Sequence, residues 1–255
     1  MPKFQLLSDL HLEFHQNFQE EILLQLKTDA DYLILAGDIC EGRNFEQFKW
    51  FFEWCSLNYK KVLFIAGNHE HYNSPNIWQD YEKMCKSLNK NNLHLLSLTK
   101  PLYIDTDIII IGNTTWTNYN NGDPLVMLDC DRMINDRRAT GLDSHTIYDE
   151  HNLLIDNLKQ TLDNNKDKKI ILVTHHPITE NYLEHSRFKG DKLNGGFSSN
   201  YNQLILDNPQ IKVICSGHTH DFWQDKIGNT NYYINPFGYP AEAKQQYKPL
   251  TFTIN

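Results

Sequence analysis

Aspartate, asparagine and histidine residues gather in five short motifs along the chain, and these residue types can bind metal ions. The motifs are Asp9-Leu10-His11, Gly37-Asp38, Gly67-Asn68-His69-Glu70, Thr174-His175-His176 and Gly217-His218-Thr219-His220. Imidazole and carboxylate groups suit Zn, Mn, Fe, Co or Ni, and the lack of a cysteine in the set argues against a closed structural zinc site. One Asp-x-His pair arises readily by chance among 12 histidines. The ordered set predicts a metal centre with exchangeable positions.

Each motif follows a short apolar run that is typical of a buried strand. The runs span residues 4–7, 32–35, 62–65, 169–173 and 211–215, and a further run spans 108–111. Near-continuous apolar runs indicate strands that are covered on both faces. Between them lie helical candidates such as 44–57, where Phe45, Phe48 and Phe51 recur at helical spacing. This alternation predicts an α/β fold, in which the carboxyl ends of the strands form the ligand crevice.

The remaining segments complete a single domain over residues 1–255. Three short runs at 222–226, 231–234 and 250–254 follow one another with only turn residues between them, which predicts antiparallel strands that close a second sheet. The polar stretch 118–146 has little periodicity, and we expect a long loop over the active-site face there. A helix is expected from Ser144 to about Leu162.

The composition restricts the classes of partner. The chain carries 24 basic and 32 acidic side chains, a net charge of −8, which disfavours stable binding to nucleic acid. No apolar run is long enough for a membrane span, and the first residues do not resemble a secretory signal, so we expect a cytoplasmic protein. Five cysteines without a Cys-x-x-Cys pair are expected to be free thiols. The sequence indicates no particular protein partner.

Taken in order, the motifs resemble the signature blocks of the calcineurin-like metallophosphoesterases. The resemblance extends from Ser8 to about Tyr239, and the segments Ser8–Phe14, Met133–Arg138 and Asn235–Tyr239 are similar to a branch of small bacterial-type members. We therefore expect a four-layer αββα sandwich of two mixed β-sheets flanked by helices, with a dimetal site at the strand ends.

The resemblance implies a ligand for each position of this dimetal site. One ion is expected on Asp9, His11 and His220, a second on Asn68, His175 and His218, and Asp38 is expected to bridge both. The ions are divalent, with Mn favoured among Mn, Fe, Zn, Ni and Co. Two such ions outweigh the two aspartates and a bridging hydroxide, so the site keeps a positive charge that attracts phosphate. The metal-bridging hydroxide is then the nucleophile.

Other residues are candidates for proton transfer and substrate binding. His69 directly follows the expected ligand Asn68 and is the candidate general acid. In the resembling family an acidic residue three positions after the bridging aspartate orients this histidine, and Glu41 holds that place here. Substrate contacts are expected from Arg138 with Asn135 and from Arg43, although a surface ion pair with a nearby aspartate also explains each arginine. His176 is expected to point away from the metals and to bond a carbonyl group.

The sequence leaves three functions open. The leading prediction is hydrolysis of a phosphodiester in a small nucleotide-like substrate. The alternatives are a phosphomonoesterase acting on a small phosphorylated molecule or protein, and a non-catalytic interaction scaffold. All the expected ligands and the candidate acid are present, which favours an enzyme.

Overall fold

The first of two β-sheets carries the amino-terminal strands. The computed structural model describes residues 1–15, 19–26, 28–74, 76–184, 186, 188–242 and 247–254. The strand order is β11-β1-β2-β3-β4, in which β1 to β4 are parallel and β11 is antiparallel to β1. The strands are β1 (Lys3–Leu7), β2 (Tyr32–Ala36), β3 (Lys61–Ile65), β4 (Leu93–Leu95) and β11 (Leu250–Thr253). In β1, β2 and β3 every residue after the first is buried, as expected for strands covered on both faces.

The second sheet has the strand order β5-β6-β7-β8-β10-β9. Its four central strands are parallel, and the edge strands β5 and β9 are antiparallel to their neighbours. The strands are β5 (Leu102–Tyr103), β6 (Ile108–Asn113), β7 (Lys169–Thr174), β8 (Ile211–Ser216), β9 (Trp223–Ile227) and β10 (Thr230–Ile234). Both sheets are therefore mixed, and the predicted strands agree with the observed ones to within one or two residues.

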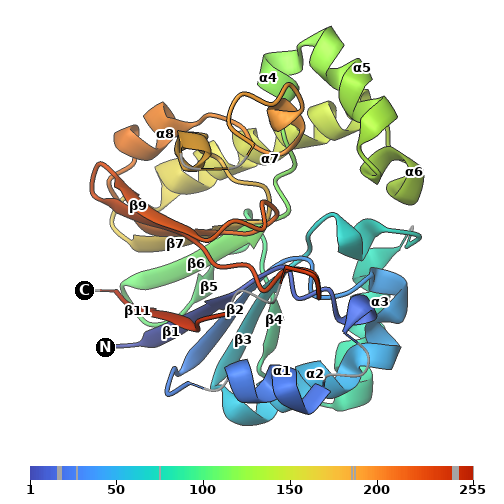
Figure 1. The fold of residues 1–255 in the computed structure, drawn as a ribbon. Helices are drawn as coiled ribbons and strands as arrows, with labels where there is room; N and C mark the ends of the chain where they lie inside the picture. Colours follow the sequence, from blue (N-terminus) through green and yellow to red (C-terminus); the bar gives the residue numbers. More distant parts are fainter. Residues whose placement is uncertain are drawn as a thin grey trace.

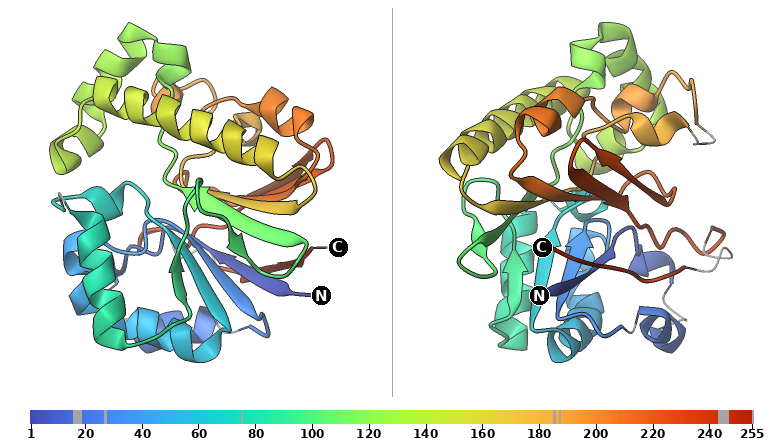
Figure 2. Two further views of the ribbon diagram at one scale, coloured as in Figure 1. Left: turned by 180° about the vertical axis from the view of Figure 1, so that it is seen from behind. Right: turned by 90° about the vertical axis from the view of Figure 1, so that its left-hand side faces the viewer.

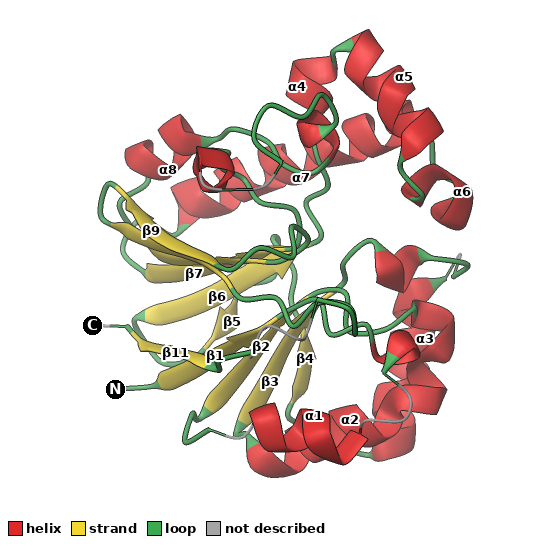
Figure 3. Ribbon diagram, viewed as in Figure 1, coloured by secondary structure: helices red, strands yellow, loops and turns green. Residues whose placement is uncertain are grey.

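The two sheets pack face to face between two layers of helices (Figures 1 and 2). Phe4, Leu6 and Ile34 of the first sheet share a buried cluster with Ile110 and Ile171 of the second. Helices α1 (Gln19–Leu26), α2 (Phe45–Asn58) and α3 (Ile77–Leu88) cover the first sheet, and α7 (Ser144–Asn164) and α8 (Asn202–Asp207) cover the second (Figure 3). This arrangement is the predicted αββα sandwich.

Short 3-10 helices occupy several loops at the strand ends. They are η1 (Leu12–Phe14), η2 (Gly42–Asn44), η3 (His69–His71), η4 (Asn181–Glu184) and η5 (Asn194–Gly196). Within the described parts of the chain, no helix is both long and apolar enough to cross a bilayer.

The segment 118–146 is mostly helical, so the prediction of a long loop is wrong. It forms α4 (Tyr119–Gly122), α5 (Pro124–Met133) and α6 (Asp136–Thr140) before α7 begins. The Asp123 side chain caps α5 by accepting the backbone N–H groups of Leu125 and Val126, and proline is well tolerated at the first helical position. Met127 and Cys130 are buried against neighbouring aromatic side chains.

The last strand joins a different sheet from the one predicted. The β9–β10 hairpin closes the second sheet, as expected, but β10 is parallel to β8. Strand β11 pairs with β1, with Lys3 opposite Thr253, and so lies at the edge of the first sheet. The two ends of the chain consequently lie side by side (Figure 1).

Candidate metal centre

The five sequence motifs meet at the carboxyl ends of strands from both sheets. Asp9, Asp38 and Asn68 follow β1, β2 and β3 of the first sheet, whereas His175 follows β7 and the His218 segment follows β8 of the second. The side chains of Asp9, His11 and His175 are inaccessible to solvent, and those of Asp38 and Asn68 are almost so. A polar cluster buried to this extent requires charge neutralisation or coordination.

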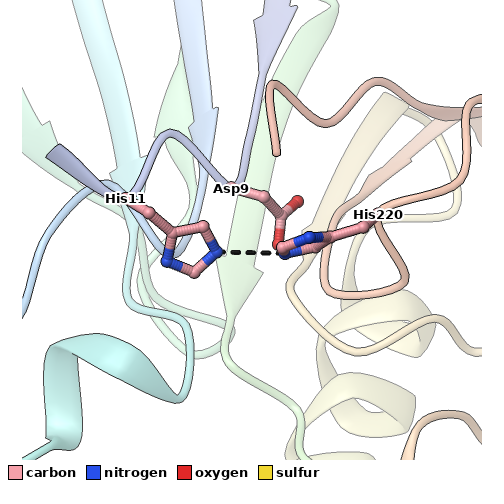
Figure 4. Close-up of side chains that lie close together, drawn as sticks. All are labelled: Asp9, His11 and His220. Atoms are coloured by element: carbon pink, nitrogen blue, oxygen red, sulfur yellow. Dashed lines mark hydrogen bonds and ion pairs between the residues drawn. The ribbon is translucent and has the colours of Figure 1, made fainter. Parts of the chain in front are cut away.

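The first group of converging donors consists of Asp9, His11 and His220 (Figure 4). The Nε2 atoms of His11 and His220 are 3.0 Å apart, and the His220 Nε2 atom lies 3.5 Å from Asp9 Oδ1. His220 Nδ1 lies 2.6 Å from a carboxylate oxygen of Glu242. Such a bond from the outer ring nitrogen orients a histidine whose other nitrogen binds a metal.

The second group consists of Asp38, His175 and His218, and Asn68 lies between the two histidines. His175 Nδ1 donates to the Ala36 carbonyl oxygen at 2.8 Å, and its Nε2 atom lies 2.9 Å from Asn68 Oδ1. The Asn68 amide nitrogen donates to the Asp136 carboxylate at 3.0 Å, which fixes the oxygen toward the histidines. Two atoms this close together can be neighbouring ligands of one cation, which would replace the proton on Nε2.

The electrostatic field of this site also favours positive charge. Burial alone would lower the pKa of His175, but the Asp38 carboxylate outweighs it and raises the pKa to about 10. Burial raises the pKa of Asp38, but His175 and His69 hold it well below its usual range. Burial lowers the pKa of His218, so this imidazole is neutral and suited to ligation. The Asp38 carboxylate also lies close to His11 and His69, and these three side chains could hold a metal ion as well. Asp38 therefore lies between His11 of the first group and His175 of the second.

The backbone is strained at five of the expected ligands. Positive φ angles, which bulky side chains rarely adopt, occur at Asp9 (53°), His11 (45°), Asp38 (55°), His218 (72°) and His220 (54°). Hydrogen bonds hold these turns, since the His218 N–H donates to Asp9 Oδ1 at 2.8 Å and the His11 N–H donates to the Asp38 carbonyl oxygen at 3.0 Å. Strain of this kind concentrates at functional sites.

Two glycines leave the space that this arrangement needs. A Cβ atom on Gly37, whose φ is +87°, would lie 2.5 Å from His175 Nδ1. A Cβ atom on Gly67 would collide with Asp38 Oδ1. Any larger residue at Gly67 would therefore displace the Asp38 carboxylate.

Glu70 fastens the loops that follow β2 and β3. Its side chain is fully buried and accepts backbone N–H groups from Asp38 at 2.8 Å, Ile39 at 2.7 Å and Gly67 at 2.6 Å. Burial and the nearby Asp38 carboxylate raise the pKa of Glu70 to about 8. No role was predicted for Glu70, although it is the charged last residue of the third motif.

The acidic partner of His69 is Glu13, so the prediction of Glu41 is wrong. His69 Nδ1 lies 3.2 Å from Glu13 Oε1, whereas Glu41 Oε2 accepts a bond from Arg43 Nε at 2.5 Å. The reason is geometric, because η1 brings Glu13 to the His69 ring while Glu41 turns toward the arginine at the surface. His11 and His69 outweigh burial and lower the pKa of Glu13 to about 2. The sequence signal for this role of Glu13 was its position two residues after His11.

A central cavity of about 230 Å³ opens over these residues. Its walls include Asp38, His69, His220 and Tyr239, and the expected substrate residue Asn135 also lines it. Arg138 donates to Asn135 Oδ1 from Nε at 3.1 Å and from Nη2 at 2.6 Å but does not line the cavity itself. Arg43 is exposed beside Glu41 and is likewise absent from the walls.

His176 and Asp136 each contact one of the expected metal ligands. The His176 ring is buried 4.0 Å from the ring centre of His218, and its nitrogens have no hydrogen-bond partner within the described residues, so the expected bond to a carbonyl is not formed. Asp136 was not predicted. It accepts bonds from the Tyr72 hydroxyl at 2.5 Å and from Asn68, and so positions the Asn68 side chain.

This fold and these convergent donor groups are those of a metal-dependent phosphoesterase. Residues 2–222 match the family described as calcineurin-like phosphoesterase, and the chain belongs to this family. The family uses divalent metal ions in a dimetal site, and the clusters of histidine and aspartate in this chain agree with such a centre.

Individual relatives are more distant. The chain is 27% identical over 238 residues to the uncharacterized protein L509 of Acanthamoeba polyphaga mimivirus, covering 84% of this chain and 82% of the viral protein. It is 26% identical over 195 residues to a probable glycerophosphodiester phosphodiesterase, GpdQ, of Arcobacter nitrofigilis, covering 76% of this chain and 58% of that protein. The structure of the phosphopantetheinyl hydrolase of Mycobacterium tuberculosis superposes with a TM-score of 0.78 at 15% identity, covering 100% of this chain and 96% of the hydrolase.

Proposed function

We propose that the protein hydrolyses a phosphodiester in a small, nucleotide-like molecule. In this proposal Asp9, His11 and His220 hold one divalent ion, preferably Mn. A second ion takes Asn68, His175 and His218, and Asp38 is shared. The convergence of these buried donor atoms from two sheets carries the proposal. When bound, the ions supply Lewis acidity and activate water for attack on phosphorus.

His69 is proposed to protonate the leaving oxygen. Its Nδ1 atom faces Glu13, so the other ring nitrogen, Nε2, is the one available to the substrate; it lies 3.4 Å from the Tyr239 hydroxyl. The ring is also held against Tyr72 with ring centres 4.3 Å apart. A proton donor fixed on two sides keeps the geometry that proton transfer requires.

The charge of the cavity favours a diester over a monoester. Asp136 and Glu242 line the central cavity, and no arginine or lysine does so among the described residues. A phosphomonoester carries a second negative charge that would meet these carboxylates, whereas a diester carries one. The absence of a guanidinium clamp therefore supports the diester.

Two model substrates test this proposal. Bis(4-nitrophenyl) phosphate and 4-nitrophenyl phosphate are assayed with added Mn and after chelation, and we expect Mn-dependent cleavage with the diester preferred. Asp38→Asn should lose both metal binding and turnover, and the exposed Asp156→Asn on α7 is the matched control. Preference for the monoester would favour the phosphatase alternative. Cleavage of neither ester with any divalent metal would refute the enzyme.

The role of His69 is tested with leaving groups of different basicity. His69→Ala should retain its metals and lose rate mainly on substrates whose leaving group is a poor one, because these need the proton most. The exposed His145→Ala serves as control. Equal losses on good and poor leaving groups would show that His69 is not the donor.

We also propose a cytoplasmic location and no stable binding to nucleic acid. All five cysteines are free, which suits a reducing compartment. The net charge of −8 opposes a polyanion.

A further inference from the structure

A second cavity, largely apolar, adjoins the central one. It has a volume of about 140 Å³, and its walls include Tyr182, Leu183, Leu193 and Phe197. Phe197 lines both cavities, as do Phe188 and Thr219. The two cavities are therefore adjacent and share part of their walls.

The apolar cavity lies beside the second donor group. The Phe197 ring stacks on the His218 imidazole, with ring centres 5.1 Å apart and planes inclined by 30°. The other walls come from the segment after β7, where η4 carries Tyr182 and Leu183. The Tyr182 hydroxyl donates to Ser198 at 3.1 Å, so its polar end is already paired.

The volume and charge of the apolar cavity define what fits. An apolar cavity of about 150 Å³ in another protein binds benzene, so this one has room for a single six-membered ring. The exposed carboxylate of Asp191 also lines it, and this charge opposes a phosphate or carboxylate group there. The fitting group is uncharged, apolar and about the size of one ring.

The position of the candidate acid shows which part of a diester would enter. His69 and Tyr239 flank the first donor group, where the Tyr239 ring stacks on His11 with ring centres 4.4 Å apart. Phe197 flanks the second group, at His218. The leaving group is placed near His69, so the apolar cavity is available to the other substituent.

We propose that the cavity formed by Tyr182, Leu183, Leu193 and Phe197 binds an uncharged, ring-sized apolar substituent that stays on phosphorus during hydrolysis. This inference rests on the proposed diesterase function, because a monoester has no such second substituent. It adds a specificity site to the metal centre and makes the substrate an ester with one apolar arm.

Two diesters with the same leaving group test the inference. Phenyl 4-nitrophenyl phosphate and methyl 4-nitrophenyl phosphate both release 4-nitrophenolate and differ only in the retained group. We expect kcat/KM to be about tenfold higher for the phenyl ester, as burial of one ring provides. Leu183→Phe and Leu193→Phe fill the cavity and should bring this ratio to within about twofold of one. Leu153→Phe, on the exposed side of α7, should keep the ratio.

A binding measurement separates this inference from the proposed function. Phenylphosphonate and methylphosphonate are not hydrolysed, and their affinities for the Mn-loaded protein are measured by calorimetry. Tighter binding of phenylphosphonate, lost in Leu193→Phe, supports the ring site even if neither diester is cleaved. If the diesters are cleaved but neither the phenyl ester nor phenylphosphonate is preferred, the ring site is refuted and the diesterase stands. If phenylphosphonate binds the wild type and both cavity variants with equal affinity, the inference is overturned.

Discussion

Glu70→Gln should destabilise the protein by a measurable amount, although the change removes only a charge. The carboxylate accepts three backbone N–H groups inside the fold, two on Oε2 and one on Oε1. A glutamine oxygen can keep the pair from Asp38 and Gly67, but its amide nitrogen then faces the Ile39 N–H. One buried donor loses its acceptor, which costs about 1–3 kcal/mol.

Glu70→Ala gives the upper limit of this effect. It leaves all three N–H groups without their acceptor, a cost of about 3–9 kcal/mol that approaches the whole stability of an ordinary domain. Glu70→Gln is therefore the interpretable variant. Relief of the cost of burying a charge places its effect toward the lower end of the range, since burial is the largest cause that raises the pKa of Glu70.

Urea unfolding at about pH 9, where Glu70 is ionised because its pKa is about 8, is the assay, with the free energy of unfolding as its readout. Glu46→Gln on α2 is the matched control, because that side chain is 58% exposed and its loss should change stability by no more than about 0.5 kcal/mol. If Glu70→Gln unfolds at the same urea concentration as this control, the three hydrogen bonds do not hold the loops and the reasoning is wrong.

Three further predictions concern other parts of the fold. Gly67→Ala should lose bound Mn in elemental analysis because its Cβ displaces the Asp38 carboxylate. Gly141→Ala, whose Cβ meets nothing within 4 Å, should keep its Mn even though the φ of +78° there strains an alanine. Leu158→Ala should lower the free energy of unfolding by about 2–5 kcal/mol in urea, because this side chain of α7 is fully buried. Burial lowers the pKa of His151. Below about pH 6.5 the imidazole of residue 151 is therefore protonated in the unfolded chain while it stays neutral in the folded chain. Stability should fall toward pH 5, and His151→Gln should reduce that slope by up to about 1.4 kcal/mol per pH unit.

The strands and the gathering of the aspartate and histidine motifs could be predicted because each depends on local sequence. Runs such as 62–65 are buried on both faces, so they need no partner information to be identified as strands. The motif after each run then lies at the carboxyl end of its strand, and parallel strands bring those ends to one edge. His11 and His220 follow strands of different sheets, so their approach depends in addition on the packing of one sheet on the other.

Other features depend on contacts that no local pattern specifies. Pairing of β11 with β1 joins the two ends of the chain, and a run such as 250–254 fits the edge of either sheet equally well. The approach of Glu13 to His69 depends on how η1 lies against η3, 56 residues away in the sequence. In α5 the signal was local, since Asp123 and Pro124 form a helix start. The polar composition of 118–146 concealed it.

The division of the ligands between the two sheets affects how the protein is assembled. Each proposed ion takes ligands from both sheets, since Asp9 and His11 face His220, and Asn68 faces His175 and His218. Each proposed ion would therefore bridge the two sheets, so metal binding would add its free energy to the docking of one sheet on the other. During synthesis the metal centre is completed only after residue 220 has been added, and an ion captured then acts as a crosslink across the sandwich.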